Sequence, residues 1–384
     1  MQVFDLLVSA LGMMIGAVML TLNVVLGLFS DQMQVTTPTP APTALATTTP
    51  PSSSTVATTS LPEVATPVPS PVKKATPLVA PPTKQTTAPP VVLQTKSPDE
   101  VNTQTRTALV NILCTTKAGG YLHPISGSGV MVSSAGVVLT NAHVAQYFLL
   151  RDFPTPNNID CVIRTGSPAQ ATYRAELLYL PPAWIEANAN QITAIHATGT
   201  GENDYAFLRI TSTVRGTSLP AILPFIHMTL DWPKKNDPVF LAAYPASFLD
   251  GSAIEANLNA ISAFSSIENI YTFNKETVDV VSLGGNPVSQ SGSSGGAAVR
   301  RQDGALFGLI ATASPGETTA ARNLSAITID YIDRSLKNQG QGGIATLLLS
   351  DITKKAAEYA ANTAPGLTQK LITALNATST PTHQ

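Results

Sequence analysis

The sequence has few charged residues, and this scarcity argues against one class of partner. Asp, Glu, Lys and Arg together make up 12% of the 384 residues, and the formal net charge is −2. Proteins that bind nucleic acids concentrate Lys and Arg in basic patches that neutralise phosphates. The sequence contains no such concentration, so we expect no nucleic-acid partner.

Cysteine is also scarce, because the chain contains only Cys114 and Cys161. A zinc site built on cysteines needs closely spaced pairs, which two residues this far apart do not supply. We therefore expect no metal site, and no motif calls for an organic cofactor. One disulfide between the two cysteines and two buried free thiols are both compatible with the sequence.

Aromatic residues are missing from Phe29 to Tyr121, and the first basic residue is Lys73. Residues 31–100 instead carry half of the 30 prolines together with many threonines and serines. Such a segment cannot bury enough apolar surface to offset the entropy of ordering it. Stalks of this composition commonly hold a domain away from a membrane. We predict a disordered linker over 31–100, with the following domain outside the cytoplasm.

The N-terminal segment from Leu6 to Phe29 lacks charged residues altogether. It is longer than the roughly 20 apolar residues that a helix needs to cross a bilayer. A cleaved signal peptide would have basic residues before its apolar core and a small-residue cleavage site after it. Here Asp5 precedes the core and no Lys or Arg does. We therefore favour a retained single-pass anchor over residues 1–30, placed in the cell membrane, although no flanking basic residues indicate its orientation.

From Val101 onward, short runs of Val, Ile, Leu and Tyr alternate with Gly, Ser, Asn and Pro. Many short strands separated by turn residues are typical of an all-β sandwich or barrel. The clearest runs are at 107–114, 126–133, 136–140, 159–165, 205–210, 237–244, 277–283 and 304–313. Residues 329–338 and 344–364 instead have apolar residues three and four apart, which predicts helices.

A run of Ser and Gly, "SQSGSSGGAAV" from Ser289 to Val299, could be a flexible loop or a tight turn around a reactive serine. A serine hydroxyl needs a general base and a group that orients the base before it can act as a nucleophile. His143 follows an apolar strand in "GVVLTNAHV", and Asp204 opens another in "ENDYAFLRI". With Ser294 they give the order His, Asp, Ser, which is that of the chymotrypsin-type triad.

The phrases "TNAHV", "NDYAFLRI" and "GSSGG", with "GSGVMV" before the first and "DPVFLAAYP" before the last, resemble in this order the trypsin-like serine endopeptidases. The resemblance covers roughly residues 105–335 and is closest to the HtrA/Deg-like branch. It implies two antiparallel six-stranded β-barrels in a protease domain over 101–338. Fewer than 50 residues follow Asn338, which is too few for the PDZ domain of that branch. Residues 339–384 should form a helical extension that packs on the barrel or mediates self-association.

The resemblance also gives a reason for the glycines around Ser294. An acyl-transfer enzyme holds backbone N–H groups against the oxyanion that forms on its substrate. Here these donors would be Gly292 and Ser294, with Gly295 and Gly296 allowing close packing. Ser293 stands where related zymogens carry an Asp that pairs with a new N-terminus, so activation by that route is not expected.

The same family pattern places the primary-specificity pocket beside this turn. Its walls would be residues 286–289 and 309–312, and the candidate lining residues are Val288, Ile310 and Thr312. Neither segment contains Asp or Glu, so we expect a preference for an uncharged, small or apolar side chain rather than Lys or Arg.

Together these features predict a membrane-anchored serine endopeptidase that cleaves polypeptide substrates through an acyl-enzyme, with no cofactor. The predicted nucleophile is Ser294, the general base His143 and the orienting residue Asp204. The C-terminal helices could also join copies of the chain into a homo-oligomer. Two alternatives come from other classes: a catalytically silent binding module on the same fold, and a surface-display protein in which the stalk is the functional part.

Overall fold

The computed structural model describes residues 95–117, 122–194, 199–273, 276–314 and 316–378. The predicted anchor at 1–30 and nearly all of the predicted linker at 31–100 lie outside these ranges. Within them, no helix combines the length and the apolar character that crossing a membrane requires.

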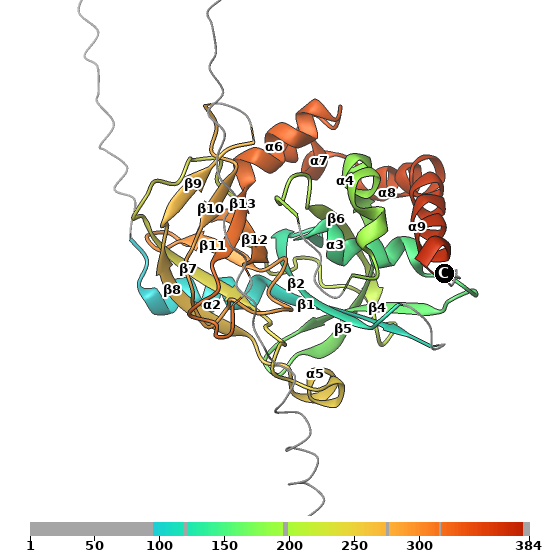
Figure 1. Ribbon diagram of the computed structural model, residues 1–384, viewed down its shortest axis with the longest axis horizontal. Helices are drawn as coiled ribbons and strands as arrows, with labels where there is room; N and C mark the ends of the chain where they lie inside the picture. The colour runs from blue at the N-terminus through green and yellow to red at the C-terminus, as the bar shows by residue number, and fades with distance from the viewer. Residues whose placement is uncertain (1–94, 118–121, 195–198, 274–275, 315, 379–384) are drawn as a thin grey trace, which may run out of the picture. The chain divides into compact units, whose positions relative to one another are not determined.

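The first half of the described chain forms a closed barrel of six antiparallel strands (Figure 1). The strand order is β1-β2-β3-β6-β5-β4, and β1 also pairs with β4 to close the ring. The strands are β1 (Leu109–Thr116), β2 (Ile125–Ser133), β3 (Val137–Thr140), β4 (Ile159–Thr165), β5 (Gln170–Tyr179) and β6 (Ala206–Thr213). Their apolar residues form one buried core, in which Ile112, Leu139 and Phe207 are fully buried.

The second half forms a seven-stranded antiparallel sheet in the order β8-β7-β11-β12-β13-β10-β9. Its strands are β7 (Pro238–Ala243), β8 (Ile261–Ser266), β9 (Asn269–Tyr271), β10 (Val280–Ser282), β11 (Ala297–Arg300), β12 (Leu306–Ala313) and β13 (Leu324–Thr328). Alternate residues of β7, namely Val239, Leu241 and Ala243, enter a second core between the strands. This alternation is what one buried face of a sheet requires.

The prediction of two six-stranded barrels is therefore correct for the first barrel and wrong for the second. The sheet ends, β8 and β9, are separated in sequence only by Ile267 and Glu268. Ile267 donates its N–H to Asp237 beside β7, whereas Glu268 donates to Ser282 on β10. The chain thus changes pairing partner at a bend, because the side chain of Ile267 is fully buried in the second core. One strand is broken into two, and no ladder joins β8 to β9.

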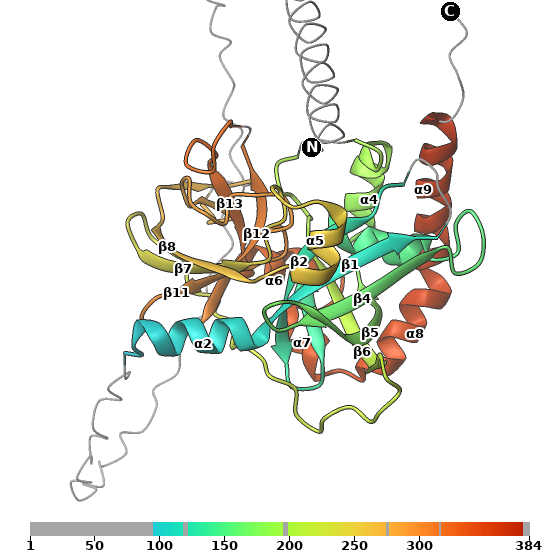
Figure 2. The ribbon, with the colours of Figure 1, turned by 90° about the horizontal axis from the view of Figure 1, so that it is seen from below.

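Helix α2 (Pro98–Ala108) precedes the first strand and lies along the junction of the two halves, as Figure 2 shows. It begins at Ser97, whose hydroxyl accepts from the N–H of Glu100 while the Glu100 carboxylate accepts from the N–H of Ser97. This capping box satisfies two N–H groups that helix formation leaves unpaired. The helix covers the boundary at 100/101 that the sequence suggested for the domain.

Short helices fill the connections, and four helices follow the last strand. The connecting segments are α3 (Ala142–Ala145), η1 (Gln146–Leu150), α4 (Pro182–Asn188), η2 (Ala189–Gln191) and α5 (Gly251–Asn257). The later helices are α6 (Ile329–Asn338), α7 (Ile344–Leu349), α8 (Ile352–Asn362) and α9 (Ala364–Thr378). The helix predicted over 344–364 is interrupted at residues 350–351, where the Asp351 carboxylate caps α8.

Helices α8 and α9 pack on the first barrel, on the side away from the second sheet (Figures 1 and 2). The Tyr359 hydroxyl of α8 donates to the carbonyl of Leu180, and the Thr368 hydroxyl of α9 donates to that of Leu149 in η1. Leu371 of α9 is fully buried. Of the two roles expected for this extension, packing on the barrel is the one present in the described residues.

Candidate active site

His143 and Asp204 are brought together by the pairing of two neighbouring strands. Thr140, the last residue of β3, lies opposite Ala206, the first residue of β6. The chain leaves β3 through Asn141, which is fully buried and caps α3, and His143 is the second residue of that helix. A fixed strand register therefore sets the separation of the two side chains.

The Asp204 carboxylate accepts two hydrogen bonds from His143. Its Oδ2 lies 2.8 Å from Nδ1 of the ring, and its Oδ1 accepts from the backbone N–H at 3.0 Å. The Asn141 amide donates to the Asp204 carbonyl at 2.7 Å. The carboxylate side chain is 6% exposed and the imidazole 31%, so the ring has an open edge while its partner is shielded from water.

The pKa of His143 reflects two opposing effects. Burial of the ring lowers the pKa, but the negative charge of Asp204 and its hydrogen bond to Nδ1 outweigh that effect. The pKa of His143 is therefore raised above the ordinary histidine value. An imidazole whose Nδ1 faces a carboxylate has Nε2 available to accept a proton.

Ser294 lies in the loop before β11, and this loop is fastened to the first barrel. Its carbonyl accepts from the N–H of Ser128 on β2 at 2.7 Å. A side chain on the next residue, Gly295, would collide with Thr140 at the end of β3 and with Ser128. The Ser294 hydroxyl donates to the carbonyl of Ala311 at 3.1 Å rather than to His143.

Two peptide groups, one joining Ser291 to Gly292 and one joining Ser293 to Ser294, expose N–H groups on the side opposite to their hydrogen-bonded carbonyls. The carbonyl of Ser291 accepts from Ala246 at 2.7 Å, and that of Ser293 accepts from Gly296 at 2.9 Å. In a trans peptide the N–H points away from its carbonyl. The N–H groups of Gly292 and Ser294 consequently have no acceptor among the described residues. Two free backbone donors beside a serine hydroxyl are what an oxyanion-binding turn requires.

Ser128 holds this turn at a second point, which the sequence did not indicate. Its buried hydroxyl donates to the carbonyl of Gly292 at 2.7 Å and accepts from the N–H of Tyr244 at 2.9 Å. Gly292 has a φ of 89°, a backbone angle that favours glycine. The motif "GSGVMV" marked this region only by family likeness, because a single serine in a strand has no signal of its own.

The residues predicted for the specificity pocket occupy different environments. Val288 and Ile310 are buried in the second core, so their side chains are closed to solvent in this structure. Thr312 belongs to β12. Arg322, which sequence reasoning missed, donates to the carbonyls of Ser289 and Gly316 and so joins two segments near the turn. A lone arginine in a loop carries no motif that could have identified it.

Cys114 and Cys161 face each other on β1 and β4 and are joined in a disulfide. The bond closes 47 residues of sequence within the first barrel. It lies on strands other than those that carry His143, Asp204 and Ser294.

Residues 127–309 match the model of the trypsin-like peptidase domain, a span that runs from β2 to β12. This stretch of the chain is similar to the trypsin-like peptidase domain. The matched residues include His143, Asp204 and Ser294. A comparison with curated protein sequences gives no match.

Solved structures similar to this chain include several proteases. A serine endoprotease from Yersinia pestis shares 19% identity at a TM-score of 0.40, over 64% of this chain and 68% of its own. The HtrA-type protease AlgW with a tripeptide shares 18% identity at a TM-score of 0.40, over 64% of this chain and 65% of its own. The active form of a protease from M. tuberculosis shares 16% identity at a TM-score of 0.40, over 70% of this chain and 96% of its own.

Proposed function

We propose that this peptidase hydrolyses polypeptides with Ser294 as nucleophile, His143 as general base and Asp204 as the residue that orients the base. The observation that carries the proposal is the pair of hydrogen bonds from His143 to the Asp204 carboxylate. They orient the ring so that Nε2 remains available for the proton of a neighbouring hydroxyl.

In the proposed reaction, the Ser294 hydroxyl turns from the Ala311 carbonyl toward His143 and gives its proton to Nε2. Its oxygen attacks the substrate carbonyl, and the N–H groups of Gly292 and Ser294 stabilise the resulting oxyanion. His143 then passes the proton to the leaving amine, which leaves an acyl group on Ser294. Water, deprotonated by His143, hydrolyses this ester and restores the serine.

A fluorophosphonate probe tests the assignment, because it reacts only with an activated serine. The full chain should be labelled, and Ser294→Ala should lose labelling and about a millionfold in kcat against a casein substrate. Ser293→Ala is the matched control, since the Ser293 hydroxyl is buried without a hydrogen bond in the part of the chain that is described. Persistent labelling of Ser294→Ala would refute the assignment. No labelling of the wild-type chain would favour a catalytically silent binding module.

We further propose that residues 6–29 anchor the peptidase in the cell membrane, with the catalytic domain outside the cytoplasm. The support is the uncharged segment and the Pro/Thr-rich stretch that follows it. The full-length protein should stay with membranes after carbonate extraction. A mature N-terminus at or beyond Ser30 would identify the segment as a signal peptide instead.

A further inference from the structure

The residue before Asp204 adopts an unusual backbone conformation. Asn203 has a φ of 58°, in the left-handed region that residues other than glycine rarely occupy. Asparagine tolerates this region better than most residues, but it still needs contacts that hold it there. Because Asp204 follows directly, the conformation of Asn203 determines the direction in which the Asp204 carboxylate leaves the chain.

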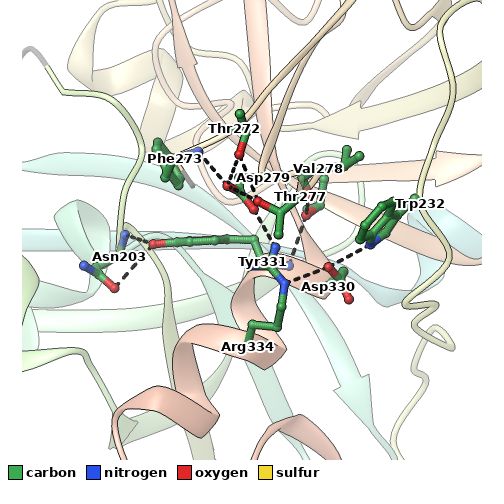
Figure 3. A network of polar contacts seen from close by, with 11 residues as sticks. Asn203, Trp232, Thr272, Phe273, Thr277, Val278, Asp279, Asp330, Tyr331 and Arg334 are labelled. Carbon is green, nitrogen blue, oxygen red and sulfur yellow. Dashed lines mark hydrogen bonds and ion pairs between the residues drawn. The ribbon is translucent and has the colours of Figure 1, made fainter. Parts of the chain in front are cut away.

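Helix α6 supplies those contacts, as Figure 3 shows for Asn203 and Tyr331. The N–H of Asn203 donates to the Tyr331 hydroxyl at 2.9 Å, and the side-chain oxygen of Asn203 accepts from the Ser335 hydroxyl at 2.9 Å. On the other side of Asp204, the Tyr205 hydroxyl donates to Ser335 at 2.9 Å. Both sequence neighbours of Asp204 are thus hydrogen-bonded to one helix.

Tyr331 is itself fixed by the second half of the molecule. Its ring packs edge-on against Phe273 at a centroid distance of 4.9 Å, and the Arg334 guanidinium lies 5.8 Å from its centre. Arg334 pairs with the fully buried Asp279, which also accepts from the N–H of Phe273 at 2.6 Å (Figure 3). Burial raises the pKa of Tyr331 to about 12, so its hydroxyl stays protonated in any pH range where the enzyme works.

Asp204 is therefore held from two directions. Asn141 and His143 bind it from within the first barrel, whereas α6 holds the backbone of Asn203 before it and the side chain of Tyr205 after it. We propose that Tyr331 is a positioning residue that sets the orientation of Asp204, and through it the basicity of His143. The proposal rests on the proposed catalytic roles of these two residues.

Replacing Tyr331 by Phe removes only the hydroxyl and keeps the ring contacts. The partly buried N–H of Asn203 loses its acceptor, so the turn relaxes and the contact of Asp204 with His143 loosens. We expect kcat/KM to fall about tenfold through kcat, the equivalent of leaving one shielded N–H unsatisfied. The acid limb of the pH profile should move to lower pH, because the pKa of His143 is raised by Asp204.

Tyr359→Phe is the matched control, since it also removes a buried tyrosine hydroxyl and one hydrogen bond, to Leu180 in the first barrel. It should lower the Tm while leaving kcat/KM and the acid limb unchanged. If Tyr331→Phe likewise lowers the Tm and leaves kcat/KM and the acid limb unchanged, Tyr331 has only a structural role and the proposal is wrong. If Tyr331→Phe does not fold, Ser335→Ala removes another hydrogen bond to Asn203 and is judged by the same two readouts.

Titration of the His143 ring by NMR separates this proposal from the proposed function. An absence of turnover in the wild-type chain would count against the proposed function alone. The positioning role would be contradicted by an unchanged His143 titration in Tyr331→Phe, whether or not the protein cleaves peptides. A lowered His143 pKa in that variant, with an unchanged value in Tyr359→Phe, is the expected result.

Discussion

The two halves of the molecule hold their reactive groups in different ways. In the first barrel, His143 and Asp204 follow from the register of β3 against β6 and bind each other directly. In the second half, the Ser294 loop is held by hydrogen bonds within its own sheet and also by contacts that reach across to Ser128 on β2. His143 and Asp204 therefore belong to one barrel, whereas Ser294 depends partly on contacts between the two halves. Loss of the Ser128 contacts should disable Ser294 and leave the His143–Asp204 pair intact.

Asp204→Asn removes the charge of the Asp204 carboxylate from the first barrel and should have the largest effect. The amide cannot stabilise the imidazolium, so kcat/KM should fall about 10⁴-fold. His143 acts as a base only when unprotonated, so wild-type activity is lost as the pH falls through its raised pKa. Without the charge of Asp204 that pKa drops, and the acid limb of the residual activity should move to lower pH. A pH profile of kcat/KM for both proteins measures this, and an unmoved limb would contradict it.

Gly295→Ala breaks the junction itself. Gly295 has a φ of 86°, and an added Cβ would lie 2.0 Å from the carbonyl oxygen of Ser128, which is backbone and cannot turn aside. We expect a loss of about 3 kcal/mol or more in the free energy of unfolding, and a loss of probe labelling in any folded fraction. Gly216→Ala is the control, because Gly216 has a φ of 72° and nothing within 4 Å. It should cost only about 1 kcal/mol. If the two variants lose the same free energy of unfolding in urea, the loss comes from backbone strain at positive φ alone and not from the collision with Ser128.

Ser128→Ala sharpens the comparison, because it removes one hydroxyl and leaves both halves folded. The carbonyl of Gly292 and the N–H of Tyr244 lose a shared partner, and the oxyanion turn becomes less well held. We expect kcat to fall about tenfold with little change in KM, since the donors act on the transition state. His143 should titrate as in the wild type. Ser265→Ala, which removes a hydrogen bond to Leu283 on the second sheet, should leave kcat unchanged.

Replacing Cys114 and Cys161 together by Ser should have the smallest effect on catalysis. The disulfide closes 47 residues within the first barrel, for which the chain-entropy model gives about 4 kcal/mol of stability. The Tm should fall, while kcat/KM at 25 °C should stay near the wild-type value because the disulfide joins β1 and β4, whereas His143 and Asp204 stand beside β3 and β6. A large loss of activity in the folded double variant would show that the disulfide also shapes the site.

The sequence predicts the strands whose apolar runs end at clear turn residues, such as 159–165, which is β4 in the structure. It also predicts α6 at 329–338 from its helical period. The Ser97–Glu100 capping box is a local sequence signal for the start of α2, whereas the apolar run at 107–114 predicts the strand β1 that follows this helix. The bend at Ile267 could not have been predicted, because it depends on a buried side chain contacting strands far away in sequence.

For the site, the motifs predict His143, Asp204 and Ser294, because His143 follows an apolar run, Asp204 and Ser294 precede one, and the three stand in the order of a known triad. The residues that support them were not predictable. Ser128 and Tyr331 act through contacts with residues more than 100 positions away in the sequence, Gly292 and Asn203 respectively. Arg322 contacts Ser289, which is 33 positions away. Hydrogen bonds across such separations leave no local pattern in a single sequence.

The packing of α9 on η1 has a consequence for the order in which the protein is made. Segment η1 directly follows the helix that bears His143, and it receives the Thr368 hydroxyl and the apolar face of α9. Synthesis proceeds at about 5–20 residues per second, and the barrel and the second sheet leave the ribosome before α9 does. The support behind His143 is therefore completed only after the barrel and the second sheet have been made. We expect a nascent peptidase to remain unreactive toward its neighbours until the helices that follow the sheet have been translated and docked.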